Sequence, residues 1–237
     1  MDKLTISIVL LPFSLYFDTV PEDSSAYLPV MDLQKKLALQ VVKENTLRYE
    51  EIENVCGVDV SYGKNTAYCS ALLINRHNWE VMDMTNISIP SSQPYIPGLF
   101  MIREARPILT TLKAMKIEMD LLLIDGHGVL HPRRCGLACY IGIVLNKPTI
   151  GVGKRLLCGS VRNDHFIDDN GEIIGFKVNN TGNDKRSVYV SVGNLISLVT
   201  SVRLVQDLTK ERQWIPEPLR LADINSKNKL NFAPQII

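Results

Sequence analysis

The segment from residue 121 to residue 134, LLLIDGHGVLHPRR, constrains this chain more than any other stretch. Four apolar residues ending in Asp125 predict a buried strand that delivers one carboxylate to the edge of a sheet. Gly126 and Gly128 then allow a tight turn and the close approach of another group. His131 and two arginines follow directly. A strand, an acid, a glycine turn and a basic cluster together are typical of metal-dependent enzymes that act on phosphodiesters.

The basic residues of this region belong to a longer stretch that contains no acid. The 237-residue chain is 46% hydrophobic with a formal net charge of +1, so it can form one domain with a full core, and its overall charge does not indicate nucleic acid. Between Gly126 and Asn163 there is no Asp or Glu, while cations occur at Arg133, Arg134, Lys147, Lys154, Arg155 and Arg162. This local excess predicts a phosphate-binding face. A solvated basic surface is the alternative.

The cysteines and the N-terminal segment bear on the compartment. The five cysteines are odd in number and include no Cys-x-x-Cys pair, which disfavours a disulfide framework and a zinc site and favours a cytoplasmic protein. The apolar stretch from Leu4 to Phe17 is too short to cross a bilayer as a helix and lacks the features of a signal peptide, so we expect no membrane partner. We expect residues 1–30 to form an arm of unknown role, either an added strand or a loosely docked segment, unless the natural start is Met31.

Strand and helix patterns predict an α/β domain over residues 31–226, followed by a tail at residues 227–237. A helix is expected over 31–42, followed by strands over 54–62, 66–74 and 80–89. Next we expect a helix that Pro107 begins or kinks and that ends at 116, and then strands over 121–125 and 149–152 around a helix over 136–145. Further strands are expected within 161–192, and a helix over 195–208. The chain from Trp214 is expected to be irregular, because Pro216 and Pro218 interrupt it. An antiparallel three-strand meander followed by helix, strand, helix and strand is the order of a ribonuclease H-like domain, with a mixed central sheet flanked by helices.

In that architecture Asp59 and Asp125 lie on neighbouring central strands and can meet at one end of the sheet. Two buried carboxylates repel each other, so burying them without a cation costs several kcal/mol. Mg²⁺ or Mn²⁺ resolves this conflict, because carboxylate oxygens are preferred ligands of hard divalent cations. A strand-end cap or an ion pair is the alternative for either aspartate taken alone.

The chain also resembles a known family through a series of motifs in order. These motifs are CGVDVSYG, PYIPG followed by REARP, LLLIDGHGVLHPRRCGLACYIGI, PTIGVGKRLLCG, YVSVG and PEPLRLAD. They are similar to the successive motifs of endonuclease V and run from about Asp32 to Asn225. The resemblance implies a ribonuclease H-like fold and a DNA-repair endonuclease that cuts near deaminated purines, chiefly inosine. Cleavage is expected at the second phosphodiester on the 3′ side of the lesion, leaving a 3′-hydroxyl and a 5′-phosphate.

The resemblance implies a role for particular residues of this chain. It implies that Asp59 and Asp125 bind the metal and that Glu104, Lys154 and Asp223 complete the catalytic group. The expected nucleic-acid and base contacts are Tyr95, Ile96 and Pro97 as a wedge, Gly98, Gly126, Gly128 and His131 around the base, and Arg133 and Arg134 on phosphates. Each has a competing interpretation: Glu104 as an exposed helical acid, Lys154 as a surface cation, Tyr95 as a loop anchor, and His131 as a partner of a backbone carbonyl in the turn.

Two positions depart from the family pattern. Ile102 replaces the motif phenylalanine, which is expected to change packing, and Asn194 replaces a histidine whose contribution is therefore in doubt. We expect a monomer that acts on DNA containing deaminated bases, or on inosine-containing RNA, with Mg²⁺ or Mn²⁺ as cofactor. The other interpretations are a different nuclease of the same fold and a non-catalytic binder of deaminated nucleic acid.

Overall fold

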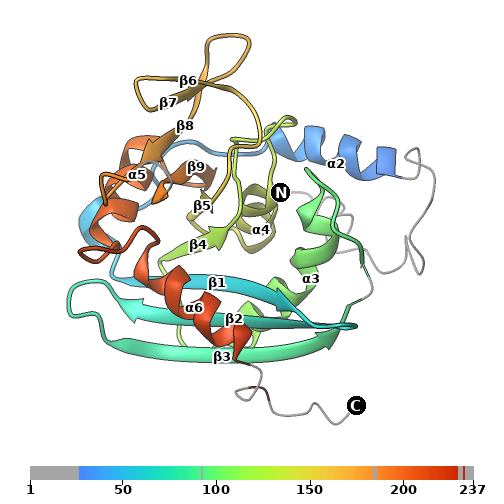
Figure 1. Cartoon of the computed structure of the whole chain (residues 1–237), viewed down its shortest axis with the longest axis vertical. Helices are drawn as coiled ribbons and strands as arrows, with labels where there is room; N and C mark the ends of the chain where they lie inside the picture. Colours follow the sequence, from blue (N-terminus) through green and yellow to red (C-terminus); the bar gives the residue numbers. More distant parts are fainter. Residues whose placement is uncertain (1–26, 92, 184–185, 229–231, 233–237) are drawn as a thin grey trace.

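The computed structural model describes residues 27–91, 93–183, 186–228 and 232, and its strands form one mixed sheet (Figure 1). Within these residues the sheet has nine strands in the order β3-β2-β1-β4-β5-β9-β8-β7-β6. The strands are β1 (Asn54–Tyr62), β2 (Thr66–Asn75), β3 (Val81–Pro90), β4 (Leu121–Asp125), β5 (Thr149–Gly153), β6 (Ser160–Arg162), β7 (His165–Ile167), β8 (Ile173–Val178) and β9 (Val188–Asn194). The antiparallel meander β1–β3 and the parallel neighbours β1, β4 and β5 confirm the expected ribonuclease H-like order.

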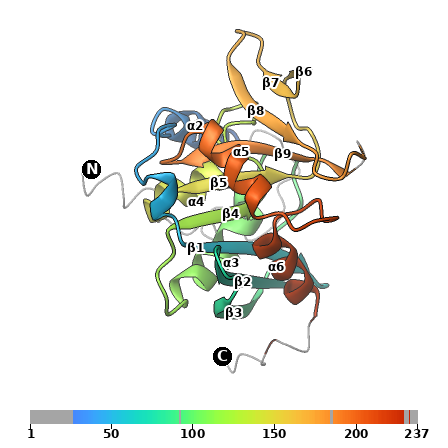
Figure 2. The ribbon, with the colours of Figure 1, turned by 90° about the vertical axis from the view of Figure 1, so that its left-hand side faces the viewer.

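Helices cover both faces of this sheet (Figures 1 and 2). They are α2 (Leu28–Ala38), α3 (Phe100–Lys113), α4 (Leu137–Leu145), α5 (Leu198–Asp207) and α6 (Glu217–Lys227), with a short 3₁₀ turn at Tyr49–Glu51. In the figures α5 and α6 lie on one face, and α3 and α4 lie on the other. Since α6 crosses β1, side chains of β1 that point to this face meet the last helix of the described chain.

The strand β4 is the centre of the core. Its residues Leu121 to Ile124 are all 0% exposed. Because helices cover both faces, a parallel central strand of this kind has a continuous apolar run rather than an alternating one. The only residue of β4 that is not fully buried is Asp125, at its carboxyl end. The sequence prediction of a buried strand that delivers one carboxylate to the sheet edge is confirmed.

Some expected elements differ in extent from the observed ones. The segment from Trp214 was expected to be irregular, and this is wrong, because α6 begins at Glu217 with Pro218 in its first turn. Proline is favoured at the start of a helix, where its missing N–H has no partner to lose. Pro107 does not begin α3 but lies inside it, and this helix ends at Lys113 rather than at 116. The helix α2 begins three residues before Met31. The predicted N-terminal arm lies almost wholly outside the described residues, as does the predicted tail apart from Lys227, Asn228 and Phe232, of which Lys227 belongs to α6.

In the part of the chain that the structure describes, none of the helices is both long enough and apolar enough to cross a membrane.

Candidate active site

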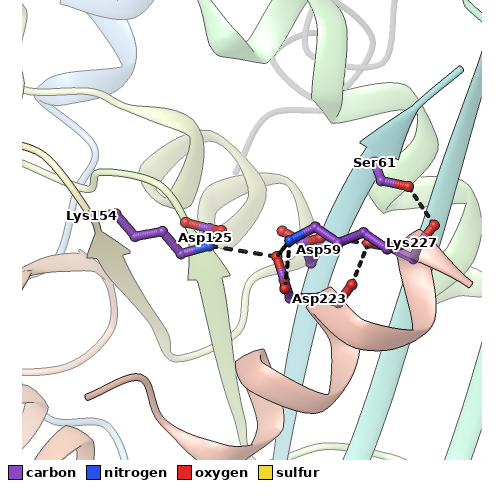
Figure 3. A network of polar contacts seen from close by, with 7 residues as sticks. Asp59, Ser61, Asp125, Lys154, Asp223 and Lys227 are labelled. Carbon is purple, nitrogen blue, oxygen red and sulfur yellow. Dashed lines mark hydrogen bonds and ion pairs between the residues drawn. The ribbon is translucent and has the colours of Figure 1, made fainter. Parts of the chain in front are cut away.

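Three carboxylates from three different elements converge at one end of the central strands (Figure 3). Asp59 lies in β1, Asp125 ends β4, and Asp223 lies on α6. One oxygen of each lies within 4.8 Å of an oxygen of the other two. The parallel register accounts for the first pair, since Val58 is opposite Ile124 and the next residue in each strand is an aspartate. The expected meeting of Asp59 and Asp125 is confirmed, with Asp223 as the third member.

Burial and the charges of neighbouring acids oppose the ionisation of Asp59 and of the nearby Glu104. Asp59 is 8% exposed, and burial together with the negative charge of Asp125 raises its pKa to about 7. Glu104 on α3 adds a further acid, and burial together with the charges of Asp125 and Asp59 raises its pKa to about 8. Such a group is stabilised in its charged form by a bound cation. The three clustered carboxylates therefore fit a hard divalent cation, for which carboxylate oxygens are the preferred ligands.

Two lysines reach the carboxylates from opposite sides (Figure 3). Lys154, directly after β5, donates to Asp125 at 2.5 Å and lies 3.7 Å from Asp223. Lys227 on α6 donates to both oxygens of Asp223, at 2.7 Å each. Burial acts to lower the pKa of Lys154, but the charge of Asp125 and its hydrogen bond outweigh burial, so this pKa is raised. Lys154 is thus a charged group beside the carboxylates, where its predicted contact with a phosphate is geometrically possible.

A cavity of about 360 Å³ opens next to the carboxylates. Its lining includes Asp125 and Lys154 and, among the expected base-binding residues, Tyr95, Gly98, Gly126 and His131. Its volume is in the range of small-molecule sites, which is about 300–1,000 Å³. Tyr95 is 59% exposed and packs edge-on against Phe100, with ring centroids 4.9 Å apart. An exposed ring beside a cavity suits stacking on an unpaired base. The wedge role of Tyr95, Ile96 and Pro97 stays a prediction.

A buried polar clamp holds the Tyr95 loop against one wall of this cavity. The carbonyl oxygen of Gly98 accepts hydrogen bonds from Gln34 Nε2 at 3.2 Å, Arg133 Nη2 at 2.7 Å and His131 Nε2 at 3.0 Å. Gln34, which is 1% exposed, also donates to the carbonyl of Cys135 at 2.8 Å and accepts from Arg133 Nε at 2.6 Å. A side chain of α2 therefore connects the loop before α3 to the loop before α4.

His131 is held as a neutral ring in this clamp. Burial lowers its pKa to about 4. The backbone N–H of Arg133 donates to Nδ1 at 3.1 Å, so the proton lies on Nε2 and is donated to Gly98. Of the two interpretations of His131, the structure shows the one in which this side chain bonds a backbone carbonyl, that of Gly98. A contact of His131 with a base stays a prediction and requires the exchange of one of these bonds.

The predicted basic face is less free of acids than the sequence indicates. Arg134 forms an ion pair with Asp168, and Lys147 forms one with Glu118 at 2.6 Å. The Arg133 side chain is engaged by Gln34 and Gly98. Acids distant in sequence therefore oppose several of these cations, and the phosphate contacts of Arg133 and Arg134 stay predictions.

Gly128 meets the protein itself rather than the cavity. A Cβ on Gly128 would lie 1.9 Å from the carbonyl oxygen of Val192, and its N–H donates to Ser191 Oγ at 2.9 Å. The predicted close approach at this glycine is therefore made by β9. A base contact of Gly128 stays a prediction.

The two departures from the family pattern, Asn194 and Ile102, are both buried. Asn194 is opposite Thr149, the first residue of β5, whereas Lys154 follows the other end of that strand. Asn194 is 4% exposed; it accepts from the backbone of Val42 at 3.0 Å and donates to that of Gly142 at 3.2 Å. It therefore joins backbone segments at the far end of the sheet. Ile102 is 4% exposed and belongs to the core, as its expected packing role requires.

The sequence did not indicate several residues of the site. Gln34, His127, Ser226 and Lys227 all contact the cavity lining or the carboxylates. Gln34 lies in an ordinary helical pattern and Lys227 begins the segment expected to be a tail, so no local signal distinguishes them. His127 is within the segment from residue 121 to residue 134, and its Nε2 bonds the carbonyl of Arg155 at 2.8 Å.

Comparisons with known proteins agree with this geometry. The family model described as Endonuclease V matches residues 35–224. The Endonuclease V of Thermofilum pendens is 38% identical over 195 residues, which are 81% of this chain and 83% of that protein. The Endonuclease V of Pyrococcus abyssi is 37% identical over 202 residues, covering 85% and 92% of the two chains.

Solved structures show the same likeness. The Endonuclease V of Ciona intestinalis, in complex with DNA containing an inosine followed by a ribo-adenosine, superposes with a TM-score of 0.79 at 26% identity, covering 87% of this chain and 98% of that one. The Endonuclease V of Bacillus subtilis superposes with a TM-score of 0.76 at 28% identity, covering 89% and 92%. With a family model that spans most of the chain and relatives above one third identity over most of both lengths, this chain belongs to the Endonuclease V family.

Proposed function

We propose that this protein hydrolyses a phosphodiester bond of nucleic acid near a deaminated purine, chiefly inosine, and cuts the second bond on its 3′ side. The observation that carries this proposal is that the carboxylate group and the cavity share Asp125 and Lys154. A base held in the cavity therefore places its own backbone beside the carboxylates. Recognition at one point and hydrolysis at another explain how one particular bond is selected.

The residues divide the work according to their positions. Asp59, Asp125 and Asp223 would hold a divalent cation, Mg²⁺ or alternatively Mn²⁺, which when bound supplies a more acidic water and neutralises phosphate charge. Glu104, with its raised pKa of about 8, would hold or orient the attacking water. Lys154 offsets the negative charge that grows on the phosphate in the transition state.

Specificity for inosine is expected in the cavity. Inosine presents O6 as an acceptor and N1–H as a donor, which is the reverse of adenine. The backbone groups around Gly98 and Gly126 line the cavity and can distinguish the two patterns. Tyr95, an exposed ring in the cavity lining, would fill the space that the extruded base leaves in the strand.

RNA is the second candidate substrate. The structure from Ciona intestinalis contains DNA in which a ribo-adenosine follows the inosine, so a ribose beside the lesion is accommodated by that protein. This observation favours inosine-containing RNA as an alternative substrate of the present chain.

Cleavage of end-labelled oligonucleotides tests the proposal. Strands of DNA and of RNA with one inosine, and matched strands with adenine, are incubated with Mg²⁺ or Mn²⁺. We expect one product from the inosine strands only and none without metal. Asp125→Ala should lower cleavage on the order of a thousandfold or more while binding remains measurable. Asp32→Ala, on an exposed helix surface, is the matched control. Metal-independent binding with no cleavage by the unmodified protein would instead identify a non-catalytic binder.

A further inference from the structure

Ser226 carries a fully buried hydroxyl group that touches two residues of the carboxylate cluster. It lies on α6 and is 0% exposed. Its Oγ is 2.7 Å from Oδ2 of Asp59 and 3.0 Å from the backbone carbonyl of Asp223. Asp59 comes from β1 and Asp223 from α6, so one hydroxyl lies between carboxylate-bearing residues that are far apart in the sequence.

The hydroxyl has one proton, and the two possible acceptors compete for it. A helical serine commonly bonds the carbonyl three or four residues earlier, which is the bond to Asp223. A carboxylate is the stronger acceptor, because a hydrogen bond to an ionised group is shorter and stronger than one between neutral groups. The shorter distance, to Asp59, agrees with this ranking. When Asp59 is ionised, Ser226 therefore donates to Asp59.

The backbone around Ser226 is fixed on β1. Ser61 donates to the carbonyl of Ser226. Two residues before Asp59, a Cβ on Gly57 would lie 2.3 Å from the backbone of Pro218, so α6 begins in direct contact with the strand. Gly57, Asp59 and Ser61 alternate along β1 and face the same side. The helix is thus held along this edge of the strand, and its serine cannot move away without moving the helix.

We propose that Ser226 is a positioning residue that holds the Asp59 carboxylate in the orientation needed to bind the divalent cation together with Asp125 and Asp223. The inference rests on the proposed metal-dependent function. Partners that orient metal-binding carboxylates by hydrogen bonds are general in metal sites, and their loss weakens metal affinity by about 10- to 100-fold.

Direct titration with Mn²⁺ on the metal-free protein, by calorimetry or by the electron paramagnetic resonance of free Mn²⁺, tests this role. Ser226→Ala should raise the Mn²⁺ dissociation constant by about 10- to 100-fold. Ser226→Thr, which keeps the hydroxyl, should restore affinity to within about threefold. In cleavage of the inosine strand, Ser226→Ala should need more Mn²⁺ for half-maximal rate, and its rate at saturating Mn²⁺ should approach that of the unmodified protein.

Ser70→Ala is the matched control. Ser70 lies directly opposite Asp59 on β2 and is 0% exposed, but its Oγ has no hydrogen-bond partner among the described residues. The Ser70→Ala variant loses a hydroxyl of the same kind next to the same aspartate, but no hydrogen bond to that aspartate. The Mn²⁺ affinity of this variant should therefore not change. Urea unfolding without metal is measured for every variant, to separate a loss of fold from a loss of orientation.

Three results would overturn the proposal. One is unchanged Mn²⁺ affinity in Ser226→Ala. Another is an equal loss of affinity in Ser70→Ala and Ser226→Ala. A third is a loss of affinity in Ser226→Ala that Thr does not restore although the Thr variant unfolds like the unmodified protein. If the unmodified protein neither binds Mn²⁺ nor cuts, the proposed function fails as well. If it does both and only the serine variants behave otherwise than expected, the positioning role alone is wrong.

Discussion

The carboxylate cluster predicts that the metal-free protein loses stability as the pH rises. The pKa values of Asp59 and Glu104, about 7 and about 8, lie above the ordinary values of 3.8 and 4.5. Between the ordinary and the raised pKa, the folded protein holds protons that the unfolded chain has released. The contribution of these two acids to the free energy of unfolding is therefore complete below their ordinary pKa values and is lost as the pH rises through 7 to 8.

The size of this effect follows from the two shifts. One pKa unit corresponds to about 1.4 kcal/mol. From pH 6 to pH 9 both acids lose their protons in the folded state, and the expected loss of unfolding free energy is about 4 kcal/mol. Asp59 and Glu104 repel each other and have the same neighbours, so they titrate as a coupled pair. The loss of free energy therefore belongs to the pair and is not assigned to either residue alone.

Urea unfolding in the presence of a chelator measures the effect at pH 6, 7.5 and 9. Asp125→Asn should be more stable than the unmodified protein at pH 9, by about 1–2 kcal/mol, because it removes a charge that opposes the ionisation of both Asp59 and Glu104. Excess Mn²⁺ should remove most of the pH dependence of the unmodified protein, since binding to the folded state adds stability. A free energy of unfolding that stays constant or rises from pH 6 to pH 9 would refute the reasoning.

Three further variants test the cavity, the clamp and the cations. Tyr95→Ala should weaken binding of inosine strands by about 1–3 kcal/mol, the usual contribution of one stacked base, while its rate at saturating substrate recovers; unchanged binding with lower stability would make Tyr95 a loop anchor. Gln34→Leu should lower the free energy of unfolding in urea by about 3 kcal/mol, because the Cys135 carbonyl and Arg133 Nε lose their hydrogen bonds to Gln34. A loss below 1 kcal/mol would show that the clamp is not needed for stability. Lys154→Gln should lower the single-turnover rate on the order of a hundredfold, whereas Arg134→Gln should lower affinity for inosine and control strands alike and flatten its salt dependence by roughly one ion. If Lys154→Gln changed only affinity and salt dependence, Lys154 would be a phosphate contact.

The parts of the fold that follow from local patterns could be predicted from the sequence. The β1 bounds agree with the prediction, and the apolar run before Asp125 identifies the central strand. The meeting of Asp59 and Asp125 followed from the expected order of strands, since parallel neighbours place equivalent residues side by side. The helix α6 was missed, because two prolines were interpreted as breakers although Pro218 lies where a helix tolerates proline.

The rest of the site depends on contacts between distant segments. The stretch with no acid predicts free cations, yet Asp168 and Glu118 come from outside this stretch and pair with two of them. Gln34 lies in a helix whose pattern is that of any amphipathic helix, and only the fold brings it to Gly98. Nothing local in the sequence marks a serine such as Ser226 as the partner of Asp59, because these residues are 167 positions apart.

That separation also determines when a newly made chain becomes able to cut. Asp59 and Asp125 are translated well before α6, which brings both Asp223 and Ser226. At about 5–20 residues per second, the ribosome needs roughly 10–30 s to go from Asp59 to Ser226. During this interval β2 to β9 are made in turn, but the third carboxylate, Asp223, is not made until α6. The carboxylate site is therefore incomplete until α6 has been made.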